Sequence, residues 1–225
     1  MPDVIVTVRG EFSALYPAER AMVKVSAQTA GADRDSVFGA AIAAAESLRA
    51  QLPAALAPSK GPISEWSSDE VRVWSEHHFT NDGAVLPRLF HSRVEFSITF
   101  SDLGALAPWI ESAVAIPSVS IDTISWDLTE ASRATATAAV REGAVRDAVA
   151  RATAYSASLG LGPVSPRAIA DQGMLDSGSA GGGPVPLART AMQNVAYVAG
   201  GKPGLELNPQ AIAVASVVDA RFTAS

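Results

Sequence analysis

Hydrophobic and polar positions along the chain alternate with two different periods, which separates the expected strands from the expected helices. Apolar residues at every second position indicate half-buried strands, whereas apolar residues three and four apart indicate amphipathic helices. The pattern predicts strands at residues 4–10, 23–29, 63–79, 92–100, 119–128, 164–170 and 212–225, and helices at residues 33–52, 101–114 and 129–159. We expect the first two strands to pair antiparallel, with Gly10 ending the first.

The most regular strand places Val94, Phe96, Ile98 and Phe100 on one face. A turn signal at residues 81–83 (NDG) separates it from the strand-like stretch at 63–79. We therefore expect a long antiparallel hairpin with one buried face.

The stretch 119–163 joins a strand to a long alanine-rich helix. Apolar positions are odd-numbered up to Ile121 and even-numbered from Ile124, which predicts a β-bulge near Asp122 and Thr123. Thr129 is the expected N-cap, and the helix runs for roughly 45 Å at about 1.5 Å per residue before Gly160. Its expected solvent face carries the pairs Glu142–Arg146 and Asp147–Arg151, and its expected buried face carries Val145, Val149, Ala152 and Leu159.

The two shorter helices follow N-cap signals. Asp33 or Asp35 opens the first, and Ser101-Asp102 opens the second. The apolar stripe expected on the first helix is Phe38, Ala41, Ile42, Ala45, Leu48 and Leu52, and that on the second is Leu103, Leu106, Ile110 and Val114.

Composition limits the class of protein. With 225 residues, 48% hydrophobic and 18% charged, the chain is long and apolar enough to fold around a sizeable core. A net charge of −6 with scattered basic residues argues against nucleic-acid binding. The absence of cysteine excludes disulfides, thiolate metal sites and cysteine nucleophiles. No signal peptide or membrane span is recognised, so we expect a cytoplasmic location.

Three histidines in the hairpin raise the question of a metal site. Neighbouring strand residues face opposite ways, so His77 and His78 cannot both reach one ion, while His91 should pair near Trp74 or Ser75. A two-histidine approach stays open, but ordinary surface or interface histidines are the favoured interpretation. The four tryptophans could line a ligand groove, although core or interface anchors are favoured: Trp66, Trp74, Trp109 and Trp126.

Other chemical motifs are weak. The glycine-rich segments GSAGGGP and AGGKPG lack the P-loop spacing, and Pro203 follows Lys202 where a serine or threonine is needed. Ser177 lies in low-complexity sequence and not in the strained turn that holds a serine nucleophile. We expect the carboxylates of Asp69 and Glu70 to be exposed to solvent. We expect no catalytic residue, no cofactor and no metal.

The order of elements resembles the SIMPL-domain family. The resemblance is carried by VIVTVRG at the start, FHSRVEFSITFSDLGAL, the segment from VSIDTISWDLT to SLGLGPV, and AIAVASVVDARFTA at the end, covering roughly residues 4–170 and 209–224. It implies an α+β fold of antiparallel sheets backed by helices and a tendency to form homo-oligomers. Better-known relatives are exported proteins linked to envelope or oxidative-stress defence, or intracellular signalling adaptors. It brings no catalytic residues.

We expect one domain over residues 1–225, with sub-domains 1–60 plus 115–225 and 61–114 as an alternative, and a flexible loop at 174–207. The leading hypothesis is a non-enzymatic, self-associating protein that uses strand edges and the small-residue helix. The alternative is a small-molecule binding module with a pocket between sheet and helix, gated by residues 176–186. An enzyme of unknown type comes third.

Overall fold

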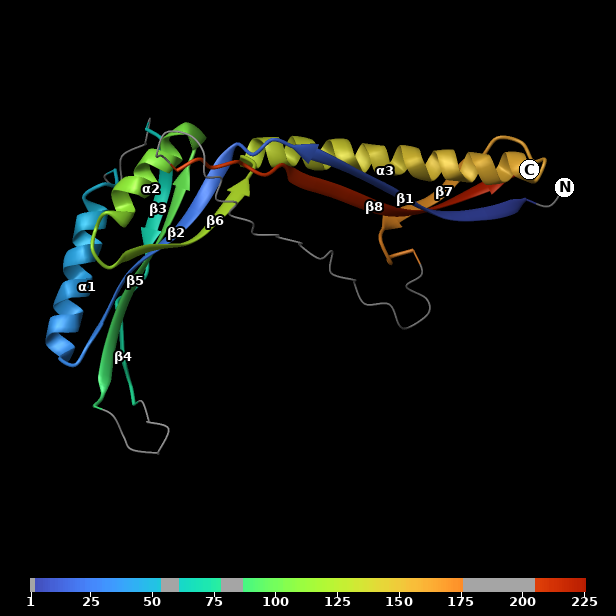
Figure 1. The fold of residues 1–225 in the computed structure, drawn as a ribbon. Helices are drawn as coiled ribbons and strands as arrows, with labels where there is room; N and C mark the ends of the chain where they lie inside the picture. The colour runs from blue at the N-terminus through green and yellow to red at the C-terminus, as the bar shows by residue number, and fades with distance from the viewer. Residues whose placement is uncertain (1–2, 54–60, 78–86, 176–204) are drawn as a thin grey trace. The chain divides into compact units, whose positions relative to one another are not determined.

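The computed structural model describes residues 3–53, 61–77, 87–175 and 205–225. All strand pairs within this part are antiparallel, and the α+β class expected from the sequence is confirmed (Figure 1). In chain order the elements are β1 (Val4–Tyr16), β2 (Arg20–Gly31), α1 (Arg34–Arg49), β3 (Ile63–Ser68), β4 (Arg72–Glu76), β5 (Leu89–Phe100), a 3₁₀ turn (Leu103–Ala105), α2 (Leu106–Val114), β6 (Val119–Asp127), α3 (Glu130–Ser158), β7 (Ser165–Asp171) and β8 (Ile212–Ala224).

The chain divides into two compact units. The long-helix unit comprises Met1–Pro17, Leu128–Tyr197 and Ala211–Ser225, and the five-strand unit comprises Ala18–Asp127 and Val198–Gln210. These boundaries differ from the sub-domains considered from the sequence, because β2 pairs with both β5 and β6 and so draws residues 18–60 and 115–127 into the same unit as 61–114. The single-domain interpretation stays a prediction.

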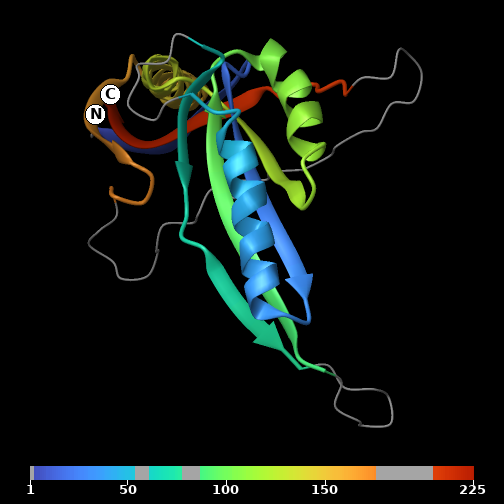
Figure 2. The same cartoon turned by 90° about the vertical axis from the view of Figure 1, so that its left-hand side faces the viewer.

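The five-strand unit has a sheet of order β3-β5-β2-β6, with β4 also paired to β5. Helices α1 and α2 cover one face of this sheet, as Figure 2 shows for α1 lying along the strands. The alternating residues of β2 and β5 face these helices, with Val23 opposite Ile98 and Val25 opposite Phe96. The predicted hairpin is confirmed, although its first arm is divided into β3 and β4.

Local signals placed several features of these elements correctly. Asp33 caps α1 by accepting a hydrogen bond from the Ser36 amide at 2.8 Å, and Thr129 caps α3 by accepting from the Ser132 amide at 3.3 Å. The β-bulge in β6 is confirmed, since Lys24 pairs with Thr123 and Val25 with Ile121, leaving Asp122 as the extra residue.

Two expectations about the helix faces are wrong at single positions. On α1, Val37 is buried, whereas Phe38 is 43% exposed. On α2, Ala113 is buried and Val114 is half-exposed. In both cases the helix turns its smaller neighbour toward the sheet, so the bulkier side chain remains at the solvent boundary.

The long-helix unit has a sheet of order β1-β8-β7, with α3 lying along β1 and β8 (Figure 1). The expected pairing of the first two strands is wrong: β1 pairs with β8 over its whole length, from Val4 opposite Ala224 to Tyr16 opposite Ile212. Gly10 does not end β1, which continues to Tyr16. The C-terminal strand is therefore the central strand of this sheet.

The buried face of α3 is a row of residues at every fourth position that are small except for Val140, which lies nearer the start of the helix than Gly10's contact at Ala144 and Ala148. The expected buried face is wrong except at Ala152, because Val145 is only partly buried, Val149 is 41% exposed and Leu159 is 64% exposed. A valine or leucine would hold the helix farther from the sheet than an alanine does. The residues that are buried are Ala136, Val140, Ala144, Ala148, Ala152 and Ser156.

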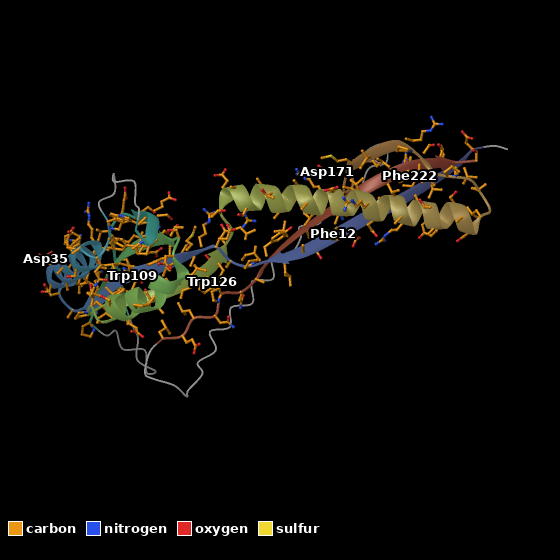
Figure 3. All side chains as sticks on the ribbon, turned by 90° about the horizontal axis from the view of Figure 1, so that it is seen from above. Phe12, Asp35, Trp109, Trp126, Asp171 and Phe222 are labelled. Carbon is orange, nitrogen blue, oxygen red and sulfur yellow. The ribbon has the colours of Figure 1, made fainter. Side chains whose placement is uncertain are left out.

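Gly10 marks the point where α3 comes closest to β1. A Cβ atom at this position would lie 2.1 Å from the carbonyl oxygen of Ala144 and 2.7 Å from the Ala148 backbone nitrogen. Two residues further along β1, the ring of Phe12 lies directly over Gly143 of the helix. Figure 3 places Phe12 and Phe222 along α3 within this unit. The sheet and helix therefore interlock through two glycines, one on each element.

A partly buried ion pair ties β1, β8 and the turn after β7 together. The Arg9 guanidinium donates to Asp219 through Nε at 2.8 Å and a terminal nitrogen at 3.4 Å, and the Gly173 amide donates to the same carboxylate at 2.7 Å. The Asp219 side chain is 13% exposed and that of Arg9 46%. The hydrogen bonds from Arg9 lower the pKa of Asp219, burial opposes this by raising it, and the Gly173 amide lowers it again. We expect the charged form of Asp219 to stabilise the folded unit.

Gly10→Ala should destabilise the long-helix unit by about 2–3 kcal/mol, because the added methyl meets helix backbone that must move away. Far-ultraviolet circular dichroism during denaturant unfolding follows α3, while tryptophan fluorescence follows the five-strand unit, which contains all four tryptophans. The matched control is Gly39→Ala on α1, where nothing lies near the added Cβ and a gain of about 0.5–1 kcal/mol is expected. Equal effects of the two substitutions would contradict the close approach at Gly10.

Asp219→Asn should lower the free energy of unfolding at neutral pH by about 1–2 kcal/mol. A larger effect is not expected, because Arg9 is half-exposed and solvent screens its charge. Because the folded-state pKa of Asp219 lies below its unfolded value, the stabilisation is complete above the ordinary carboxyl pKa of about 3.9 and is lost as the pH falls below it. The difference between wild type and variant should therefore shrink in acid. Asp171→Asn, at an exposed carboxylate on the paired strand β7, is the control and should leave the pH profile unchanged.

Candidate functional site

The outer edge of β1 is the longest regular strand edge in the described part of the chain. β1 keeps one register with β8 over 13 residues, and no described strand pairs with its other side. Three of the other outer strands are irregular: β7 shifts register between Pro166 and Ala168, β6 is bulged at Asp122, and β3 shifts near Ile63. The fourth, β4, keeps one register with β5 but has only 5 residues. Exposed apolar residues lie on β1, namely Ile5, Phe12 and Leu15.

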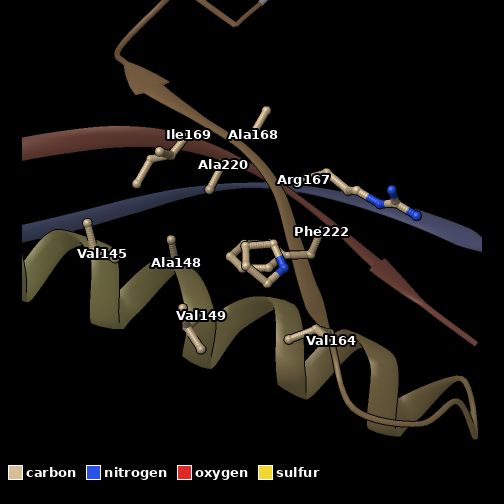
Figure 4. Close-up of a pocket in the computed structure, with 10 residues that line it drawn as sticks. Val145, Ala148, Val149, Val164, Arg167, Ala168, Ile169, Ala220 and Phe222 are labelled. Carbon is tan, nitrogen blue, oxygen red and sulfur yellow. The ribbon is translucent and has the colours of Figure 1, made fainter.

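A second feature of the long-helix unit is an apolar trough of about 400 Å³ between α3 and β7 (Figure 4). It exists because α3 covers β1 and β8 and leaves β7 largely uncovered. Ala220 and Phe222 of β8 form its floor. One wall comes from Val145, Ala148 and Val149 of α3, and the other from Val164, Pro166, Arg167, Ala168 and Ile169 in and before β7.

The sequence hypothesis of a pocket between sheet and helix named no lining residues, and it missed the position of this trough because it assigned the valines of α3 to the buried face. The signal that could have found it is the period-four repeat of small residues, which includes Ala144, Ala148 and Ala152. Once that repeat is taken as the buried stripe, Val145 and Val149 fall on its flank. An apolar flank beside a fully buried stripe indicates a second, partly covered surface.

The histidines of the hairpin do not form a metal centre in the described part of the chain, where no group of three or more metal-binding side chains occurs. His91 pairs with Trp74 as expected, and the two rings stack at 5.2 Å between centroids with an interplanar angle of 12°. Glu76 approaches both, accepting from Trp74 Nε1 at 3.1 Å and lying 3.9 Å from His91 Nε2. His77 contacts Arg88, and His78 lies outside the described residues.

The uncovered face of the five-strand sheet carries a polar network around the bulge in β6. Ser26 is fully buried and donates to Asp122 at 3.1 Å, and Arg93 donates to the other oxygen of Asp122 at 2.9 Å. Arg93 also pairs with Glu95 at 2.9 Å. The Arg93 charge is thus paired with two carboxylates, although its Nε makes no hydrogen bond to a described residue, and the bond from Ser26 holds Asp122 at the bulge.

The tryptophans serve as packing residues in this unit. Trp66, Trp109 and Trp126 pack against its core, and Figure 3 labels the last two there. Trp66 donates to the Pro53 carbonyl at 2.9 Å, and Trp109 contacts the Phe100 ring with 5.2 Å between centroids. The interpretation of these three as core anchors is confirmed.

The remaining candidates give no catalytic arrangement. Asp69 and Glu70 are exposed, as expected, and Glu142 and Asp147 form their predicted pairs with Arg146 and Arg151. Lys202, Ser177 and the glycine-rich segments lie outside the described residues, as does the expected gating loop at 176–186.

Comparison with known proteins gives one family. Among the described residues, no helix combines the length and hydrophobicity needed to cross a membrane. A search of curated proteins finds no match. The model of the SIMPL family, described as a protein of unknown function (DUF541), matches residues 6–222. The match spans nearly the whole chain and confirms the resemblance carried by its strand and helix order, so the chain belongs to the SIMPL family.

Proposed function

We propose that the protein acts without catalysis, by self-association through the outer edge of β1. The observation that carries the proposal is the length and regularity of this edge, which has no strand partner over 13 residues in the described part of the chain. One of its backbone groups is already bound within the chain, since the Glu11 amide donates to Asp147 of α3 at 2.9 Å. An open strand edge is a template for pairing with another chain, and proteins that avoid such pairing interrupt their edges with proline, charge or bulges. β1 has none of the interruptions that β6 and β7 have.

Side chains on β1 support the same surface. Ile5 is 66% exposed and Leu15 is 72% exposed, and their odd positions place them on the face of β1 opposite α3. Two copies related by a two-fold axis could pair their β1 strands antiparallel and bring these residues together across the new interface. Such pairing would remove both strand edges from solvent.

The alanine face of α3, expected from the sequence as a second association surface, is not available for this purpose. Ala144, Ala148 and Ala152 are fully buried against the sheet of the same unit. The proposal is therefore confined to the strand edge. A stress-related or envelope-related role is a further proposal that rests on the family resemblance alone, and a cytoplasmic location is a further proposal that rests on the sequence interpretation.

The double substitution Ile5→Lys, Leu15→Lys should shift the protein toward its 23.2 kDa monomer. We expect the dissociation constant to rise at least about tenfold, because lysines on an edge strand disfavour pairing with another chain. Sedimentation equilibrium or light scattering over a range of micromolar concentrations measures the change.

Ile169→Lys on β7 is the matched control, since this residue is 58% exposed on the opposite edge strand of the same sheet. It should leave the mass unchanged. A wild-type protein that stays monomeric throughout, or an equal loss of association in the control, would rule out the β1 edge as the interface.

A further inference from the structure

The apolar trough between α3 and β7 has the form of a ligand site. Its volume of about 400 Å³ falls within the range of roughly 300–1,000 Å³ typical of small-molecule pockets. It is open along one side, and its walls come from α3 and β7 (Figure 4). We propose that the trough binds the hydrocarbon chain of an anionic amphiphile such as a fatty acid.

The walls carry apolar surface that the fold itself does not use. Val149 is 41% exposed and Ile169 is 58% exposed, and they belong to opposite walls. Ala148 and Ala220, by contrast, are buried in the core beneath. A hydrocarbon chain laid over this floor would remove both exposed side chains from water, which is the main source of affinity for an apolar ligand.

The charge at the trough favours an anion over a cation. Arg167 is the only charged residue among those that line it, and no carboxylate lies among them. Its side chain is 62% exposed, donates from Nε to the Thr223 hydroxyl at 3.2 Å, and lies 3.7 Å from an Asp3 oxygen. Figure 4 shows the guanidinium directed away from Phe222 and out of the trough. An anionic head group could therefore remain in solvent beside Arg167, without the cost of burying a charge.

The backbone around the trough disfavours a peptide strand as the occupant. Pro166 lacks an amide hydrogen, and the register of β7 shifts between Pro166 and Ala168. A strand added at this edge would lose ladder hydrogen bonds at the point where the trough lies. A flexible hydrocarbon chain needs no such pairing.

Calorimetric titration with dodecanoate below its micelle concentration tests the proposal. We expect saturable binding of about one molecule per chain, and clearly weaker binding of dodecyltrimethylammonium, which has the same tail and a positive head. Val149→Glu and Ile169→Glu should each weaken dodecanoate binding at least about tenfold, since they place a carboxylate in the trough. Arg167→Gln should weaken binding of dodecanoate but not of dodecanol.

Leu159→Glu is the matched control, because Leu159 is similarly exposed at the end of α3 and does not line the trough. It should bind dodecanoate like the wild type. Methyl NMR shifts on titration should concentrate on Val145, Val164 and Ile169. Absence of saturable binding, equal effects of Val149→Glu and Leu159→Glu, or equal affinity for the cationic amphiphile would overturn the proposal.

This test is independent of the β1 edge. The molar mass of the self-associated protein in solution should be the same for wild type and Val149→Glu, because the trough lies beside β7 and not beside β1. If Val149→Glu instead lowered the mass and dodecanoate did not bind, the trough would be a contact between copies of the chain and the ligand proposal would be wrong.

Discussion

The close contact between α3 and the β1–β8 sheet is the constraint on which the long-helix unit depends. The Ala144 carbonyl lies so close to Gly10 that no side chain fits at that position, and the Phe12 ring lies equally close to Gly143. A 29-residue helix cannot be stabilised by propensity alone, because most helical stability in proteins comes from packing of one face. Here the packing face consists mainly of the alanine side chains of α3. Its stability therefore comes from close approach over a long contact, and not from large side chains.

That constraint also determines which surfaces stay uncovered. A helix seated directly on β1 and β8 covers a narrow strip of the sheet, so β7 extends beyond it and the trough opens between them. The valines flanking the alanine row cannot enter the contact and line the trough instead. At the opposite edge of the sheet from β7, β1 is the outer strand and has no further described strand beside it. The trough is thus a consequence of covering three strands with one helix, whereas the free edge of β1 follows from its place at the end of the sheet order.

Local features of this fold could be predicted from the sequence, and the long-range ones could not. The caps at Asp33 and Thr129, the pairing of His91 with Trp74 and the bulge at Asp122 all follow from patterns within a few tens of residues. The pairing of β1 with β8 joins residues about as far apart as the chain allows, and nothing in the alternation of Val4, Val6 and Val8 distinguishes β8 from β2 as the partner. The helix face was mispredicted because hydrophobicity ranks valine above alanine, whereas the distance set by Gly10 selects for size.

The two units differ in what they present to solvent, and this difference bears on where interactions occur. On the sheet face of the five-strand unit opposite its helices, Ser26 and Arg93 both donate to Asp122, and Arg93 forms an ion pair with Glu95. Most of the exposed large apolar side chains in the described part of the chain lie in the long-helix unit, on β1, α3 and β7. Scattered exposed apolar residues need no explanation, but those gathered along a free strand edge or in a concave trough mark interaction sites. The two proposed interaction sites therefore both lie in the long-helix unit, where most of the exposed apolar surface of the described residues is gathered.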